Sequence, residues 1–306
     1  MRIYYLLAIV LLLASISCTL DKTDYEAEIS TEVTEFKEFK EVASINVAPY
    51  TISIEALNGT FYKGYNDIRI KVFNGQTNAN VVASEVTFLP IFSNANGTVS
   101  CPHQYRFEYK TAEKCYSGYS VFTTETNASG NWKLYLGFTI GNENYTVNLE
   151  ISVLPQNNKN LNMTTFTGND GEQYCIALVA PQKPKVSENQ LVAGIYKYNQ
   201  PTNPTGIFPD STQFSYSQVD HFLLQLDPRM PEPSMGNHSS PNNQDLTQQS
   251  DGLYHGVVNY TMTGNWTLNL ILSNQNGQII KGTVVPTDFT PGVEGMKSEL
   301  YIDTRF

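Results

Sequence analysis

The stretch YSVFTTETNASGNWKLYLGFTI (residues 119–140) has a counterpart in LYHGVVNYTMTGNWTLNLILSN (residues 253–274). Both contain Gly-Asn-Trp, and these two motifs hold the only tryptophans of the chain, Trp132 and Trp266. After Trp266, leucines occupy every second position up to Leu272. A period of two is typical of a β-strand with one buried face. We therefore expect one core strand in each stretch, with its tryptophan buried.

The similarity extends upstream of these strands. YTISIEALNG (50–59) matches YCIALVAPQK (174–183), and a pair of prolines between the anchors also matches. Residues 45–155 then form copy one, residues 156–171 a polar linker, and residues 172–306 copy two with a C-terminal tail. Short alternating runs separated by Gly, Asn and Pro predict β-strands, and no helical period is sustained. We expect an all-β protein of two tandem immunoglobulin-like β-sandwiches.

The N-terminus has the features of an export signal. One arginine precedes an apolar run from Ile3 to Ala14, and Ser15-Ile16-Ser17 leads to Cys18. The run is short for a membrane span and has signal-peptide proportions. Small residues before a cysteine resemble the lipobox of bacterial lipoproteins. We expect residues 1–17 to be a lipoprotein signal peptide and Cys18 to carry the lipid that anchors the protein in the cell envelope, in the outer membrane. The alternative is an ordinary cleaved signal.

The charge of the chain is concentrated near this anchor. The chain has 306 residues and a net charge of −10, and residues 21–42 hold eight acidic and three basic side chains. We expect residues 18–44 to be a solvated acidic tether. A nucleic-acid partner is not expected, because such proteins carry a basic face.

Three stretches of copy two follow a known pattern: YCIALVAPQKPKVSENQLVAGIYK (174–197), LDPRMPEPSMGNHSSPN (226–242) and DGLYHGVVNYTMTGNW (251–266). This copy resembles the YtkA/FixH-like domain of bacterial extracytoplasmic proteins. That pattern has a Met-Gly-His loop followed by Tyr-x-Gly and Met-x-Gly-x-Trp, and here Asn237 separates Gly236 from His238. The resemblance implies the fold and an association with copper or with cytochrome oxidase assembly, but no reaction.

Copy two contains soft metal ligands at positions where copy one has none. Thioether sulfur favours Cu(I) over hard cations. We expect a Cu(I) site formed by Met230, Met235, His238 and Met262. The corresponding positions of copy one are about Ile91, Asn96, Val99 and Ala128. The alternative is that Met230 and Met262 fill the core and that His238 is a solvated loop residue. His221 and His255 could join a site, but strand surfaces are expected for them.

The three cysteines after Cys18 leave several pairings open. Outside the cytoplasm two of them are expected to oxidise, as Cys101–Cys115, Cys101–Cys175 or Cys115–Cys175. The favoured pair is Cys101–Cys115, which closes a loop within one domain. A metal site of Cys101, His103 and Cys115 is the alternative.

Enzymatic motifs are absent from the sequence: it has no Gly-x-Ser-x-Gly, phosphate loop or His-Glu-x-x-His. We therefore predict a non-enzymatic binding lipoprotein for copper capture or delivery, with a copper-handling or other envelope protein as partner. The alternatives are a structural or protein-interaction module without metal, and a glycan-binding lipoprotein that uses aromatic residues such as Tyr105 and Phe107.

Overall fold

The structure is a computed structural model that describes residues 38–156, 159–201 and 207–305. Within these residues the chain is all-β, with 22 strands and two short 3-10 helices, and its sheets pack as in β-sandwiches. No helix in the described ranges is long and apolar enough to cross a membrane. The predicted signal peptide and the predicted lipidation at Cys18 lie outside the described residues.

The first half of the chain packs two antiparallel sheets around one core. Their strand orders are β1-β2-β4-β8-β7 and β10-β9-β5-β6. The strands are β1 (Phe39–Val47), β2 (Tyr50–Leu57), β4 (Gly64–Asn74), β5 (Glu85–Asn94), β6 (Gly97–Val99), β7 (Glu108–Lys110), β8 (Cys115–Phe122), β9 (Gly130–Ile140) and β10 (Glu143–Ile151). Short strands β3 (Phe61–Tyr62) and β11 (Val153–Leu154) pair in parallel. Ile54 of β2 and Trp132 of β9 are fully buried in the shared core, as the alternating pattern predicts.

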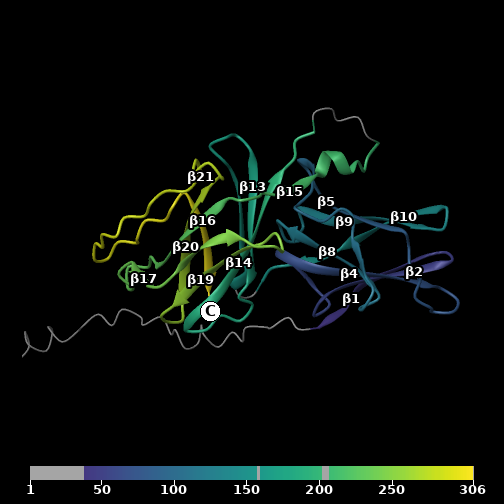
Figure 1. Cartoon of the computed structure of the whole chain (residues 1–306), viewed down its shortest axis with the longest axis horizontal. Helices are drawn as coiled ribbons and strands as arrows, with labels where there is room; N and C mark the ends of the chain where they lie inside the picture. The colour runs from purple at the N-terminus through teal and green to yellow at the C-terminus, as the bar shows by residue number, and fades with distance from the viewer. Residues whose placement is uncertain (1–37, 157–158, 202–206, 306) are drawn as a thin grey trace, which may run out of the picture. The chain divides into compact units, whose positions relative to one another are not determined.

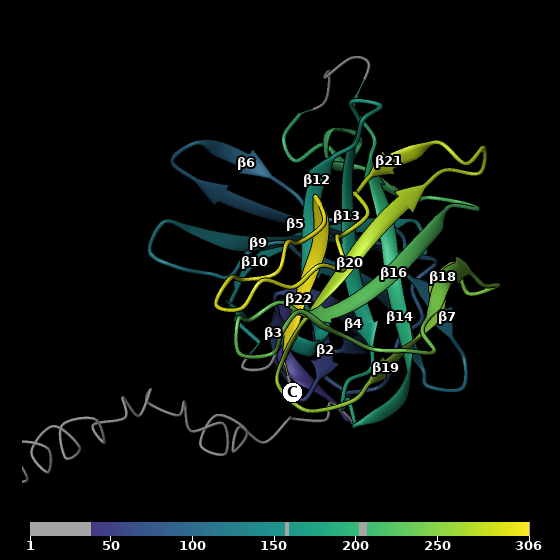
Figure 2. The ribbon, with the colours of Figure 1, turned by 90° about the vertical axis from the view of Figure 1, so that its left-hand side faces the viewer.

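The second half forms one curled sheet in the order β12-β13-β14-β19-β18-β16-β20-β21 (Figure 2). The sheet is continuous because β18 pairs with both β19 and β16. The strands are β12 (Met163–Thr167), β13 (Gln173–Ala180), β14 (Ser187–Tyr198), β15 (Tyr216–Gln218), β16 (Leu223–Met230), β17 (His238–Ser239), β18 (Gln244–Gln248), β19 (Tyr254–Tyr260), β20 (Asn265–Ser273), β21 (Ile279–Lys281) and β22 (Leu300–Arg305), with 3-10 helices η1 (Lys159–Leu161) and η2 (Ser211–Phe214). Off the main path, β15 pairs with β14, β17 with β16 and β22 with β20.

The strand order repeats between the two halves. The run β1-β2-β4-β8 corresponds to β12-β13-β14-β19, and β10-β9-β5-β6 corresponds to β22-β20-β16-β17. One buried asparagine repeats as well. Asn66 bonds to the backbone of the residues two and four positions before it, and Asn189 makes the same three hydrogen bonds. The repeated sequence is thus accompanied by a repeated topology.

Three segments that we predicted to be irregular form strands. β1 begins at Phe39, inside the predicted tether 18–44, because an edge strand tolerates charged side chains on its exposed face. β12 and η1 lie within the predicted linker 156–171. β22 lies in the predicted C-terminal tail and pairs with the tryptophan strand β20.

The route from β20 to β22 differs from its counterpart in the first half. There, β9 passes into β10 after only two turn residues, 141–142. In the second half the chain forms β21, leaves the sheet at Gly282, and returns as β22. Gly282 has φ +107°, and a Cβ there would collide with the carbonyl oxygen of Leu270. We call residues 282–299, which the ribbon of Figure 1 draws in yellow, the strap.

Candidate functional site

Met230 and His238 lie directly opposite each other where β16 pairs with β17. Opposite residues of an antiparallel pair have Cβ atoms ~5 Å apart. Met230 is 3% exposed and shares a core with Trp266. The His238 ring lies against the Trp266 ring with centroids 6.0 Å apart and an interplanar angle of 62°. The structure therefore places the thioether of Met230 and the imidazole of His238 on opposite residues of one strand pair, next to Trp266.

The two other predicted methionines lie at the same end of the sandwich. Met262 is held by the indole, since Trp266 Nε1 donates to the Met262 carbonyl at 3.0 Å. Met235 lies in the turn before His238, whose backbone N donates to the Met235 carbonyl at 3.2 Å. Both side chains are partly buried and pack against the core that contains Met230 and Trp266. We call the four residues Met230, Met235, His238 and Met262 the Met–His cluster.

One nitrogen of His238 has a fixed partner. Nε2 lies 2.8 Å from the hydroxyl oxygen of Thr261, and Nδ1 has no hydrogen-bond partner among the described residues. A bond at one ring nitrogen fixes the ring and leaves the other nitrogen for a ligand. Thr261 was not predicted to be part of the site. The sign of it in the sequence was that it directly precedes Met262.

Asn237, which separates Gly236 from His238, ties the loop to the strap. Asn237 is buried with φ +53°, a left-handed conformation that asparagine tolerates. Its Nδ2 donates to the Pro286 carbonyl at 3.3 Å, and Arg229 Nη1 donates to the same oxygen at 3.3 Å. Oδ1 of Asn237 is buried without a partner among the described residues. Sequence reasoning missed this contact because about fifty residues separate its two sides.

Further contacts hold the strap beside the loop that precedes His238. Gly295 N donates to the Pro231 carbonyl at 2.7 Å. A Cβ on Gly236 would lie 3.6 Å from the Phe289 ring, so this ring lies over the turn. Figure 1 shows β17 next to the strap. The strap and the Met–His cluster therefore occupy one end of the second half.

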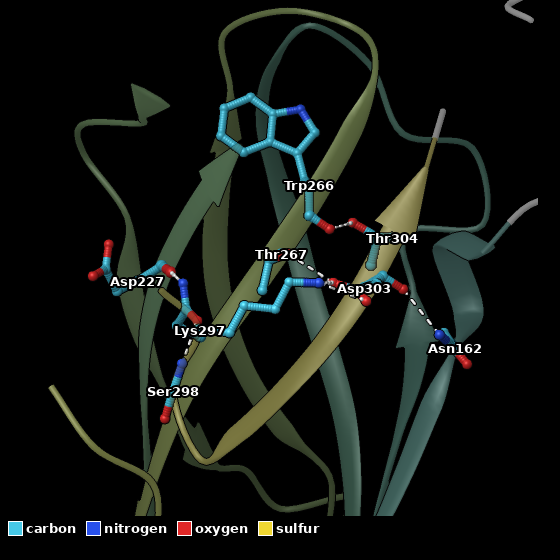
Figure 3. Close-up of polar contacts among 9 residues, drawn as sticks. Asn162, Asp227, Trp266, Thr267, Lys297, Ser298, Asp303 and Thr304 are labelled. Atoms are coloured by element: carbon cyan, nitrogen blue, oxygen red, sulfur yellow. Dashed lines mark hydrogen bonds and ion pairs between the residues drawn. The ribbon is translucent and has the colours of Figure 1, made fainter. Parts of the chain in front are cut away.

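The C-terminal end of the strap is fixed to the tryptophan strand and its neighbour (Figure 3). Lys297 Nζ lies 3.0 and 3.1 Å from the two carboxylate oxygens of Asp303, and Thr267 Oγ1 donates to Oδ1 of Asp303 at 2.6 Å. Ser298 N donates to Oδ1 of Asn269 at 2.8 Å. These bonds set where the strap rejoins the sheet.

The first half has no thioether or imidazole at the two positions that correspond to Met230 and His238. Phe92 pairs with Val99 in β5–β6, as Met230 pairs with His238, and the Phe92 ring lies 5.3 Å from the Trp132 ring. Glycine repeats too, because a Cβ on Gly130 would meet Phe92 and a Cβ on Gly264 would meet Met230. The register thus corrects the predicted match. Phe92 rather than Ile91 occupies the position of Met230, while Val99 does match His238.

The other histidines take no part in the cluster. Both ring nitrogens of His255 are engaged, Nε2 with Asp251 at 2.9 Å and Nδ1 with Gln190 at 3.2 Å. His221 lies in an exposed turn with φ +59°.

The cysteines are free thiols in the structure, and all three are buried. Cys101 Sγ lies 3.3 Å from the hydroxyl oxygen of Ser120, near the end of β8, whereas Cys115 begins that strand. Five strand residues span ~16 Å, and a disulfide requires Cα atoms within ~7 Å. The structure therefore does not bring the favoured pair Cys101–Cys115 together. The 101–104 segment is held at the other end of β8, where Val121 N donates to the Pro102 carbonyl.

His103 is buried and serves the same segment. Its Nδ1 donates to the Cys101 carbonyl at 2.7 Å, and burial lowers the pKa of His103 to about 4. A nitrogen that donates this bond is not a metal ligand, and Cys115 lies elsewhere, so the alternative site of Cys101, His103 and Cys115 is not assembled. In the described ranges, no three His, Cys, Asp or Glu side chains gather as metal ligands. Thioethers do not belong to that set.

The aromatic residues considered for glycan binding do not form a platform. Phe107 is buried and stacks on Phe88 with ring centroids 5.0 Å apart. Tyr105 is partly buried and packs beside Leu89 and Ile91.

Comparisons with known proteins identify no family for the chain, so an assignment of function depends on its own residues. No family model and no curated protein matches the chain. A solved structure described as a conserved domain protein from Bacillus anthracis has 11% identity, covers 89% of this chain and 92% of its own, and gives a TM-score of 0.24. A chimeric titin Z1Z2-Z1Z2 tandem carrying a GRGDS peptide from fibronectin has 16% identity, covers 71% and 88%, and gives a TM-score of 0.15.

Proposed function

We propose that the protein is a non-enzymatic lipoprotein of the bacterial envelope that captures or delivers copper as Cu(I). Its two halves are immunoglobulin-like sandwiches, and the second is YtkA/FixH-like. Cys18 carries the lipid, and the Met–His cluster provides the copper ligands. The partner is another envelope protein that handles copper.

The chemistry of the cluster fits Cu(I). Met230, Met235 and Met262 supply neutral thioethers, and His238 supplies an imidazole nitrogen. Soft neutral donors favour Cu(I), and thioethers bind without losing a proton. When bound, Cu(I) would be held for exchange with a partner rather than used in a reaction.

The single observation that carries the proposal is the contrast between matched positions. Phe92 packs against Trp132 and its partner Val99 is exposed, whereas Met230 and His238 occupy these two positions in the second half, where the His238 ring lies against Trp266. Hydrocarbon side chains occupy both positions in the first half, so the fold itself does not require a thioether or an imidazole there. Binding of a metal ligand explains why Met230 and His238 occur together at these positions.

The test is an anaerobic titration of the full chain in detergent micelles with Cu(I), in competition with a chromophoric chelator. Wild type should take up one equivalent. The M230L/M235L variant should lose this uptake and keep its fold, since Met and Leu have similar volumes. Equal affinities of variant and wild type would refute the proposed ligands.

A second candidate, binding of a protein partner without metal, is favoured by the strap. Four of its apolar side chains are strongly exposed: Val284 (84%), Phe289 (45%), Val293 (55%) and Met296 (66%). Exposed apolar clusters mark interaction sites. Absence of Cu(I) uptake by wild type would favour this candidate.

A further inference from the structure

Met296 is an exposed methionine beside the Met–His cluster. Its residue is 66% exposed, whereas Met230 is 3% exposed. Methionine is more often buried than exposed. No sequence pattern marked this residue, because it lies far along the chain in the strap.

The backbone on both sides of Met296 is fixed. Before it, Gly295 N bonds to the Pro231 carbonyl, one residue after Met230. A Cβ on Gly295 would contact the Asn237 side chain, one residue before His238. After it, Lys297 is held by Asp303 (Figure 3). Met296 is therefore exposed at a fixed place next to the loop that carries three ligands of the cluster.

We propose that Met296 is a fourth thioether of the copper pathway, which captures Cu(I) at the surface and passes it to the Met–His cluster. The inference rests on the proposed copper function. The buried position of Met230 supports it, since a donor copper complex in solution cannot reach that sulfur directly. An exposed thioether next to the loop supplies a first point of exchange.

The exchange is balanced in atoms and charge. Met296 sulfur replaces one ligand of the incoming complex, donors of the cluster then replace its remaining ligands and Met296, and the displaced ligands return to solution. Each donor is neutral, copper stays Cu(I), and no proton or electron is released. Met296 should therefore change the rate of uptake more than the final affinity.

The test compares wild type, M296L and the control M163L, all as full chains in detergent micelles. Met163 is partly buried in β12 and belongs to a different apolar cluster from Met230. Stopped-flow absorbance follows transfer of Cu(I) from its chromophoric chelator complex, and equilibrium competition gives the affinity. A second readout is the NMR signal of the Met296 methyl group during substoichiometric addition of Cu(I).

We expect M296L to slow transfer by about tenfold, within the range over which mutations change association rates, with an affinity within about twofold of wild type. M163L should match wild type in both. The Met296 methyl signal should shift or broaden before one equivalent is added. Equal transfer rates for M296L and wild type would overturn the role of Met296 and leave the cluster intact. No uptake by wild type would overturn the copper function, and this inference with it.

Discussion

Replacing Met230 separates its packing from its sulfur chemistry. Met230 is 3% exposed in the core around Trp266, and its Cε occupies the space that a Cβ on Gly264 would need. In M230A the three side-chain heavy atoms beyond Cβ are lost, and truncation of a buried methionine costs about 2–5 kcal/mol in free energy of unfolding. M230L keeps the volume and should cost under about 1.5 kcal/mol.

Urea titrations of metal-free protein measure these costs, and hydrogen exchange with mass spectrometry assigns the loss to the second half. F92L is the matched control, because Phe92 packs against Trp132 in the first half as Met230 packs in the core of Trp266 in the second half. Adding Cu(I) at a hundredfold excess over Kd should stabilise wild type by about 2.7 kcal/mol, and M230L by clearly less. The reasoning fails if M230A unfolds at the wild-type urea concentration. It also fails if M230L gains as much stability from Cu(I) as wild type.

Three further predictions concern groups outside the cluster. Burial lowers the pKa of His103 from 6.5 to about 4, so between these pH values only the unfolded chain takes up a proton at this residue. The free energy of unfolding should therefore fall as the pH drops through this window. Urea midpoints measured against pH should show the fall, and H103Q should make the curve flatter. D303N should remove the ion pair with Lys297 and speed proteolysis of the strap, which limited digestion with mass spectrometry would measure. An unchanged rate of cleavage would contradict the role of Asp303 in anchoring the strap. Burial raises the pKa of Cys101 to about 12 and raises that of Cys175. Iodoacetamide should therefore label both thiols in urea and neither in the native protein. Fast labelling of the native protein would count against their burial.

The sequence was sufficient for the strands around the tryptophans. Alternation after Trp266 predicted a strand with one buried face. β20 buries that face, but Thr267 and Asn269 on the opposite face are buried as well, where they bond to Asp303 and Ser298. The all-β class followed from the same pattern, because period and turn residues are local signals. The strand at 39–47 was missed, since an edge strand with charged residues resembles a tether in composition.

The surroundings of the candidate site depend on contacts that no local pattern encodes. Met230, Met235 and His238 were recognisable from their spacing, but the partner of Asn237 is Pro286. The match of Ile91 to Met230 was one residue off, because side chains of a strand alternate and only pairing fixes the register. Strap contacts of this kind become visible only once the chain is folded.

Asn237 links the turn before His238 to the strap. A shift of one residue in the register of β17 would move His238 to the other face of the strand. Asn237 adopts a left-handed conformation within the turn, and His238 pairs with Met230. The Asn237 amide bonds to the strap, a segment that the first half lacks between β9 and β10. Asn237, the strap and the Met–His cluster therefore occur in the same half and at the same end of it, as expected if the strap serves the proposed copper site rather than the fold.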